Sequence, residues 1–252
     1  MEFKTRSLLI GTSVAIAVLI TLAGCPTRPH GPEAPAATQV GAPTTPPGSL
    51  RAPGHEGRPF DVASRESLLT ILAFRGGALA KAGHNHVIAS HDVSGTFYVP
   101  EDVLRSTFEL HVPVAQLAID EPDLRAQEGP DFPKEVPDSA KEGTRRNMLS
   151  EALLNGAQYP DFALISQHIE PAPTGSGVRA DVQVTIRGQT HTLSVPVTYS
   201  LANGELVASG DLPIKQSELG LTPFSAMLGA LQVQDELRVR FRIVAREART
   251  QH

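Results

Sequence analysis

The sequence predicts an all-β fold in which about eight antiparallel strands are interrupted by one short helix. Along 178–187, five apolar residues alternate with five polar ones, which is the period of a strand with one buried face. Short turns at 188–189 and 202–204, each containing glycine, join consecutive strands as hairpins. Strands with one apolar face suit either a sandwich of two sheets or a closed barrel, and periodicity alone does not separate the two.

The individual elements follow from the same pattern and from local breaks in it. Strands are predicted at 67–74, 87–99, 106–114, 162–169, 178–187, 193–201, 206–214 and 237–245. The helix is predicted after the third of these. Ser139 and Glu142 have the spacing of a capping box, and Gly156 is expected to end the helix. Gly143 weakens the first turn, so Thr144 is an alternative start.

The first 25 residues differ from the rest of the chain. Lys4 and Arg6 precede an uncharged, mostly apolar stretch of about 16 residues, which is short for a membrane span and typical of a signal peptide. It ends in Leu-Ala-Gly-Cys at 22–25, which resembles the lipobox of bacterial lipoproteins. We expect 1–24 to be a lipoprotein signal peptide and Cys25, the only cysteine, to carry the lipid. The alternative is a signal-anchor helix with a chance cysteine.

The following segment is rich in proline, with nine prolines between residues 26 and 59. Such a composition buries too little apolar surface to fold, so 25–59 is expected to comprise the lipidated cysteine and a disordered tether. The folded domain is expected at 60–246, with a polar tail at 247–252. The formal net charge of −5 gives no attraction for nucleic acid, and no nucleic-acid partner is expected.

Several short sequence blocks follow one another in the C-terminal two thirds of the chain. They are AGHNH at 82–86, GTF at 95–97, RRNML at 145–149, YPDF at 159–162, VTIRGQTH at 184–191, LGLTPFS at 219–225 and VQDEL at 233–237. In this order they resemble the YceI-like family of bacterial secreted proteins. The resemblance implies an eight-stranded, lipocalin-like antiparallel barrel whose interior takes a long apolar ligand, typically a polyisoprenoid lipid.

The chain departs from the family pattern in two places. Residues 120–140 form an extra-long acidic segment, which we interpret as a solvated surface insertion, with a calcium site or a lid as alternatives. On the predicted helix, Asn147 and Met148 stand where the family pattern has an acidic residue and a histidine. Both departures concern the end of the barrel that would hold a ligand's head group.

The candidate ligand-binding residues are of three kinds. Aromatic and aliphatic side chains on inward faces would line a cavity or fill the core, two arginines on the helix would meet an anionic head group, and two histidines would form a polar mouth or serve structure. They are Phe97, Phe108, Leu110, Phe162 and Phe224, then Arg145 and Arg146, then His84 and His86. No metal site is expected, because His91 falls on the opposite strand face from His84 and His86.

The sequence thus predicts a lipid-binding, non-enzymatic protein held at the cell envelope by lipidated Cys25. Pro26 after the cysteine favours the outer membrane, with the domain facing the periplasm. No cofactor is expected beyond a bound isoprenoid or similar amphiphile, and the oligomeric state is left open. One alternative is an interaction or structural module with a barrel filled by its own side chains, using Arg238, Arg240 and Arg242 as a partner surface. A metal-dependent enzyme that uses the histidines is a further alternative.

Overall fold

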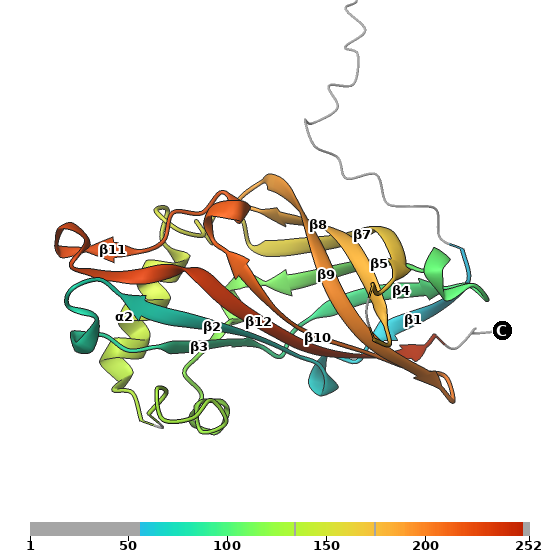
Figure 1. Cartoon of the computed structure of the whole chain (residues 1–252), viewed down its shortest axis with the longest axis horizontal. Helices are drawn as coiled ribbons and strands as arrows, with labels where there is room; N and C mark the ends of the chain where they lie inside the picture. The colour runs from blue at the N-terminus through green and yellow to red at the C-terminus, as the bar shows by residue number, and fades with distance from the viewer. Residues whose placement is uncertain (1–55, 134, 174, 249–252) are drawn as a thin grey trace, which may run out of the picture. The chain divides into compact units, whose positions relative to one another are not determined.

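The computed structural model describes residues 56–133, 135–173 and 175–248, so the predicted signal peptide, Cys25 and nearly all of the predicted tether lie outside the described residues. Within those ranges, eight antiparallel strands close into a ring (Figure 1). In ring order they are β1 (Arg58–Val62), β4 (Ser94–Val99), β5 (Thr107–Pro113), β7 (Asp161–Pro171), β8 (Val178–Ile186), β9 (Gln189–Ala202), β10 (Glu205–Lys215) and β12 (Leu231–Glu247), which pairs again with β1. The all-β fold class and the closed barrel are therefore confirmed.

Four further strands extend this ring at one end. The long strand β12 pairs with β10 along one edge and with β1 and then β2 along the other. The additional strands are β2 (Leu68–Gly76), β3 (His86–Ser90), β6 (Ala118–Ile119) and β11 (Ser225–Ala226). β3 pairs with β2 and β6, and β11 pairs with β12. The barrel wall is thus longer on the side of β2 and β3.

A packed core closes the end of the barrel at which β1 pairs with β4. Inward side chains from β1, β4, β10 and β12 fill the space there, and Phe60 and Ala245 are completely buried. Examples are Phe60, Val99, Leu206 and Ala245. Full burial of a large aliphatic or aromatic side chain contributes about 1.5–3 kcal/mol each to stability. This core forms the floor of the space inside the barrel.

The barrel wall opens between β9 and β10 at the opposite end. These strands pair only between Thr198–Ala202 and Glu205–Ser209, although both continue beyond that ladder. Pro196 pairs with Arg179 of β8 but lies beyond the end of the ladder between β9 and β10. The rest of β9 and β10 is therefore not joined by a ladder.

The strand predicted at 87–99 is in fact two strands, β3 and β4. The chain leaves the sheet at His91–Val93, where the backbone N–H of Asp92 donates to Ser90 Oγ at 3.3 Å. Before the break β3 pairs with β2, and after it β4 pairs with β1. Odd-numbered apolar residues continue across the break, but Ile88 faces the cavity in β3 and Phe97 faces it in β4, so the inward face changes parity where the partner changes.

The predicted helix is α2 (Asp138–Leu149), but its ends differ from the prediction. Pro137 occupies the N-cap position and no side chain caps the helix, so the capping box of Ser139 and Glu142 is wrong. The helix also ends before Gly156, because Ser150 is extended and its hydroxyl donates to Asn147 O at 2.7 Å. A second helix, the four-residue α1 (Pro122–Arg125), and the strands β1, β6 and β11 were not predicted.

The acidic segment is packed against the barrel, so its interpretation as a solvated insertion is wrong. Phe132 and Leu124 lie on the outer face of β2 and β3, where they contact Leu72, Phe74 and Val87. This second, smaller core lies outside the ring, and Phe74 and Phe132 meet edge to face with centroids 6.0 Å apart. Apolar residues between the carboxylates thus hold the segment on the outer face of the wall.

Candidate ligand-binding cavity

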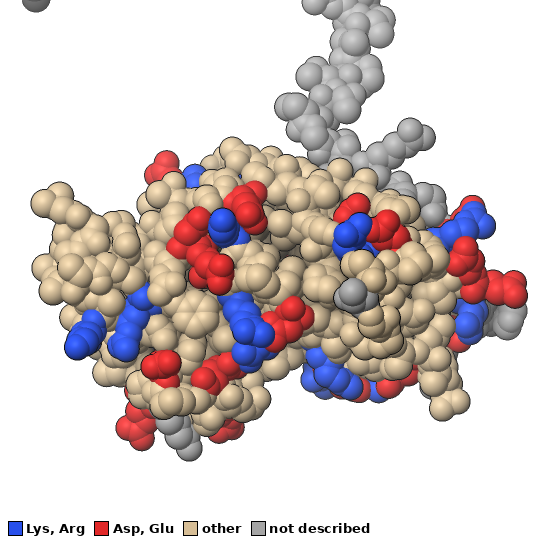
Figure 2. Space-filling model, viewed as in Figure 1, with Lys and Arg blue, Asp and Glu red and all other residues tan. Residues whose placement is uncertain are grey.

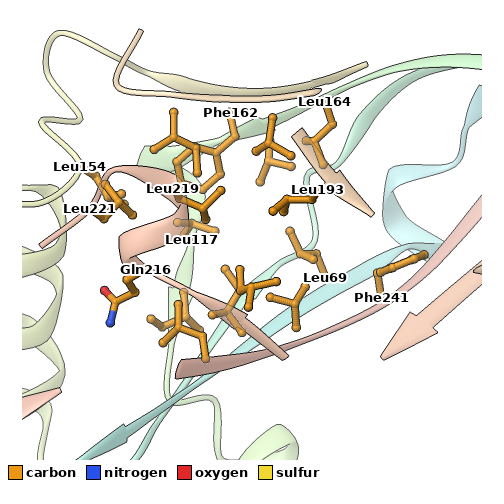
Figure 3. Close-up of a pocket in the computed structure, with 18 of the residues that line it drawn as sticks. Leu69, Leu117, Leu154, Phe162, Leu164, Leu193, Gln216, Leu219, Leu221 and Phe241 are labelled. Carbon is orange, nitrogen blue, oxygen red and sulfur yellow. The ribbon is translucent and has the colours of Figure 1, made fainter. Parts of the chain in front are cut away.

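The barrel encloses an apolar cavity of about 340 Å³ above the packed floor. Side chains from every strand of the ring except β1, together with β2, β3 and α2, line it (Figure 3). Figure 3 shows Leu69, Leu164 and Leu193 converging on this space from β2, β7 and β9. Ligand pockets have volumes of about 300–1,000 Å³, so the space is large enough for part of a long apolar molecule.

Six of the predicted site residues line the cavity. They are His86, Phe97, Phe108, Leu110, Phe162 and Phe224. They come from β3, β4, β5, β7 and the segment before β11, so the fold brings together residues up to 138 positions apart. The rings of Phe97 and Phe108 are tilted neighbours with centroids 5.3 Å apart. These residues are correctly placed for contact with an apolar ligand.

The other three predicted site residues are not part of the cavity lining. The guanidinium of Arg145 donates to the carbonyl oxygens of Ala115 at 3.0 Å and Leu117 at 2.6 Å, and so fastens α2 to the chain before β6. Arg146 is exposed. The ring of His84 lies 6.3 Å from that of His86, just before β3 begins. Arg145 therefore has a structural role, which is to hold α2 against the chain before β6.

The cavity has a polar end formed by four neutral side chains near α2. They are His86, Thr144, Asn147 and Gln216. Gln216 is almost fully buried and donates from Nε2 to Gln234 O at 2.8 Å (Figure 3). No Lys, Arg, Asp or Glu is among the described residues that line the cavity. This end can therefore offer hydrogen bonds to a head group but no ion pair.

A buried charge network fixes the orientation of His86. Asp120 is fully buried and its Oδ2 lies 2.7 Å from His86 Nδ1, while its Oδ1 accepts from the backbone N–H of Val87 at 2.9 Å. The same Oδ1 is 2.5 Å from Nη1 of Arg125, which is also fully buried. Arg125 donates further to Asn85 O and Pro133 O, both at 2.7 Å. The acidic segment is thereby joined to β3.

This network determines which nitrogen of His86 faces the cavity. With Asp120 ionised, its carboxylate accepts a hydrogen bond from Nδ1–H, so the neutral imidazole carries its lone pair on Nε2. Thr144 Oγ1 lies 3.4 Å from Nε2, but its hydroxyl donates to Ala140 O at 3.0 Å. His86 Nε2 is therefore available as an acceptor at the polar end of the cavity.

The pKa of Asp120 is held below its usual value. Burial opposes ionisation, but it is outweighed by the hydrogen bonds from His86 and Val87 and by the charge of Arg125. A carboxyl group with a lowered pKa in the folded state stabilises the fold at every pH above its unfolded pKa, which is about 3.9. That contribution is lost as the pH falls from there through the folded value.

We therefore expect the stabilities of the wild type and Asp120→Asn to converge in acid. At pH 7 the variant lacks the ionised partner of Arg125 and unfolds at lower urea concentration than the wild type. As the pH is lowered below about 4, the wild type loses the same contribution and the gap narrows. Other carboxylates with lowered pKa values, such as Asp211 and Glu66, are present in both proteins and cancel. A gap that stays constant from pH 7 to pH 3 would contradict the assignment.

Two of the three outward arginines of β12 are ion-paired within the chain, while Arg242 donates to the backbone oxygen of Glu66 at 3.2 Å. Arg238 lies 2.6 Å from Asp211, and Arg240 lies 2.7 Å from Glu128 and 3.2 Å from Asp211. In Figure 2 red and blue side chains are interspersed over the face that carries β10 and β12. The charge of this surface is thus largely compensated, which weakens the interpretation of these arginines as a partner surface.

In the part of the chain that the structure describes, no three His, Cys, Asp or Glu side chains gather closely enough to hold a metal ion. No helix among these residues is long and apolar enough to cross a membrane.

Comparison with known proteins agrees with the barrel fold described above. Residues 74–245 match a family described as the YceI-like domain. No curated protein matches the chain. Among solved structures, Burkholderia cenocepacia BcnA is 19% identical, with 73% of this chain and 99% of that chain covered and a TM-score of 0.54. This likeness supports the barrel fold.

Two further structures are similar at lower scores. A polyisoprenoid binding domain from Saccharophagus degradans, implicated in plant cell wall breakdown, is 11% identical, with 75% of this chain and 98% of that chain covered and a TM-score of 0.48. The Campylobacter jejuni YCEI protein is 12% identical over 63% of this chain and 82% of that chain, with a TM-score of 0.45.

Proposed function

Because this chain belongs to the YceI-like family, we propose that it binds one lipid with a long apolar tail inside its barrel. The observation that carries the proposal is the apolar cavity of about 340 Å³ above a packed floor. A barrel that served only as a structural module would fill this space with its own side chains, since protein interiors contain few voids larger than a water molecule. The cavity therefore favours binding over the side-chain-filled alternative.

The arrangement of the cavity suggests how the ligand lies. Each methylene transferred from water contributes about 0.8 kcal/mol, so a long tail supplies affinity with few polar contacts. The tail would extend from the polar end towards Phe97 and Phe108, above the closed core. An isoprenoid tail is the one that the family resemblance implies.

The polar end suggests a neutral head group. A phosphate or carboxylate held here would find no cationic partner among the described lining residues, so the lining offers it no ion pair. A hydroxyl or a carbonyl fits better, since His86 Nε2 accepts a hydrogen bond and the amide of Asn147 both donates and accepts. We propose an isoprenoid alcohol or a similar neutral amphiphile, and a binding role rather than catalysis.

A titration with polyprenols of graded length tests this function. The protein would be a form that begins at residue 26, which keeps every residue that the structure describes. We expect saturation at one lipid per chain and an affinity that rises with tail length until the cavity is filled. Binding that does not saturate, or that is independent of tail length, would contradict the proposal.

We also propose that the chain is a lipoprotein anchored through Cys25 at the cell envelope, in the outer membrane with its barrel facing the periplasm. The support is the uncharged apolar stretch ending in Leu22-Ala23-Gly24-Cys25, with Pro26 after it. Several acyl chains on one residue hold a protein stably, whereas one chain is marginal. An anchor of this kind would keep the barrel beside the membrane that contains its ligand.

Replacing Cys25 with serine is expected to release most of the protein from the membrane fraction. The barrel should remain folded, because every residue that the structure describes is unchanged. Cell fractionation with detection of the barrel measures the release, and circular dichroism of the released protein checks the fold. A variant that stays in the membrane fraction like the wild type would refute lipidation as the means of attachment.

A further inference from the structure

Two neighbouring loops at the cavity end of the barrel expose large apolar side chains to solvent. The first is residues 77–83 of the connection between β2 and β3, and the second is residues 226–230, from the last residue of β11 to the start of β12; together we name them the apolar tip. The side chain of Leu228 is fully exposed, Met227 is 68% exposed and Leu79 is 43% exposed. Of the five large apolar residues that are exposed in the described part of the chain, three thus lie in the apolar tip.

The two loops are held together and belong to the barrel wall. The backbone N–H of Leu79 donates to Ala230 O at 2.7 Å. Gly77 approaches so closely that a Cβ atom there would lie 2.4 Å from the same oxygen. Met227, Leu228 and Gly229 are all left-handed, a conformation that non-glycine residues seldom adopt. The chain thus holds its most exposed leucine outward in a strained turn instead of folding it inward.

The apolar tip lies next to the polar end of the cavity, where the lining residue Asn147 is exposed to solvent and marks the cavity entrance. Phe224 and Val233, on either side of the second loop, line the cavity, and so do Ala73 before the first loop and His86 after it. Figure 1 places β11 and the β2–β3 connection at the same end of the barrel as α2. A surface that contacts the apolar tip would therefore lie beside the polar end of the cavity.

The charge of the apolar tip fits a lipid surface. Residues 77–83 and 226–230 contain Lys81 and no Asp or Glu. Figure 2 shows an uncharged lobe at the end of the molecule where Figure 1 places β11, with basic side chains below it. Exposed leucine and methionine beside a basic residue suit the apolar and anionic layers of a phospholipid bilayer. The apolar tip is a convex projection, which can enter a bilayer more readily than it can form a broad protein interface.

We propose that the apolar tip inserts into a phospholipid bilayer and so places the cavity entrance at the membrane surface. The ligand would then pass between bilayer and barrel without crossing bulk water. The insertion itself is independent of any ligand, whereas the passage of ligand rests on the function proposed above. With Cys25 lipidated, the thirty residues between Cys25 and Glu56 span at most about 100 Å, which exceeds the roughly 58 Å length of β12. The anchor would therefore permit the apolar tip to reach the same membrane.

An environment-sensitive dye tests the insertion directly in the full chain. In a Cys25→Ser background, a nitrobenzoxadiazole dye is attached at Leu228→Cys, or at Leu104→Cys as the control. Leu104 is also exposed, but it lies in the 3-10 turn Val103–Arg105 beside Glu56, to which Arg105 is ion-paired. Position 104 lies where the predicted tether enters the domain. If the protein met the vesicles only through its N-terminal segment, the dye at 104 would respond more than the dye at 228.

With vesicles of phosphatidylethanolamine and phosphatidylglycerol, we expect dye at 228 to shift its emission to the blue and to be quenched by nitroxide-labelled lipid. Dye at 104 should do neither. The proposal is overturned if 228 does not respond, if both positions respond equally, or if 228 responds to protein concentration without vesicles, which would indicate a second copy as the occupant.

A second variant separates membrane contact from ligand binding. In the full chain, Met227→Ser/Leu228→Ser should slow the transfer of a polyprenol between vesicles about tenfold or more, since two large apolar contacts are lost. Its equilibrium binding of the polyprenol should match that of the wild type, because neither residue lines the cavity. Unchanged transfer would overturn the role of the apolar tip. If the wild type did not bind polyprenol at all, the proposed function would be overturned, but the dye result would still test the insertion of the apolar tip.

Discussion

Replacing Arg125 with methionine is expected to lower the free energy of unfolding by about 3–5 kcal/mol. The substitution keeps an extended side chain over Phe132 but removes the positive charge from a site with no solvent access. Asp120 would remain buried and would lose its closest cationic partner, and the carbonyl oxygens of Asn85 and Pro133 would lose their donor. Urea unfolding at pH 7 measures the loss.

The control for this prediction is the exposed pair of His91 and Glu121, whose atoms lie 2.8 Å apart in the same region. Glu121→Gln should change the free energy of unfolding by less than about 1 kcal/mol, because exposed ion pairs contribute little. If Arg125→Met were as mild as Glu121→Gln, the buried network would not be a major support of the fold.

The second large effect is expected from blocking the cavity. Leu193 on β9 is half-buried and points into the cavity, where Figure 3 shows it facing Leu69. Leu193→Trp would fill part of the 340 Å³ with a larger ring and should weaken polyprenol binding about tenfold or more, the equivalent of about two methylenes of tail that no longer fit. Isothermal titration of polyprenol binding, with a thermal melt as a check of the fold, measures the effect.

Thr192→Trp is the matched control. Thr192 is adjacent on the same strand, but its side chain lies on the outer face and is exposed. The control should bind polyprenol as the wild type does. If both variants bound equally well, the ligand would not lie in this cavity.

Local periodicity predicted the fold well where a strand keeps one partner on each side. The strand β8 lies within one residue of its predicted range, because Val178 to Ile186 alternate strictly and face the same interior along their whole length. The division of 87–99 into β3 and β4 escaped prediction because alternation shows which residues are buried but not in which core. Val87 is buried on the outer face of β3 against Phe132, whereas Phe97, of the same parity, lines the cavity from β4.

The candidate site was predictable only in part. Phe108 could be assigned to the inward face because apolar and polar residues alternate along 106–114, whereas Phe97 and Phe162 were candidates only as aromatic residues of predicted strands. The sequence could not show that the space between them is empty, since a filled core and a lined cavity require the same apolar faces. The structure supplies that volume.

The charged residues escaped prediction for a different reason. Asp120 and Arg125 are distant from His86 in sequence, and they lie in a segment whose many carboxylates made it resemble a solvated loop. The one available signal of a packed segment was the presence of the apolar residues Leu124 and Phe132 near Arg125 among the carboxylates. The contacts of Arg145 could not be predicted either, because its partners are backbone carbonyl oxygens, which every residue has.

The central claim is that the barrel carries a lipid, and native mass spectrometry of the protein purified from bacterial cells tests it most directly. The spectrum should show a population heavier than the polypeptide by the mass of one long-chain lipid. Organic extraction should release that lipid, and the emptied protein should take up one polyprenol per chain when it is offered. A protein that carries no lipid from the cell and also takes up no polyprenol afterwards would contradict the account.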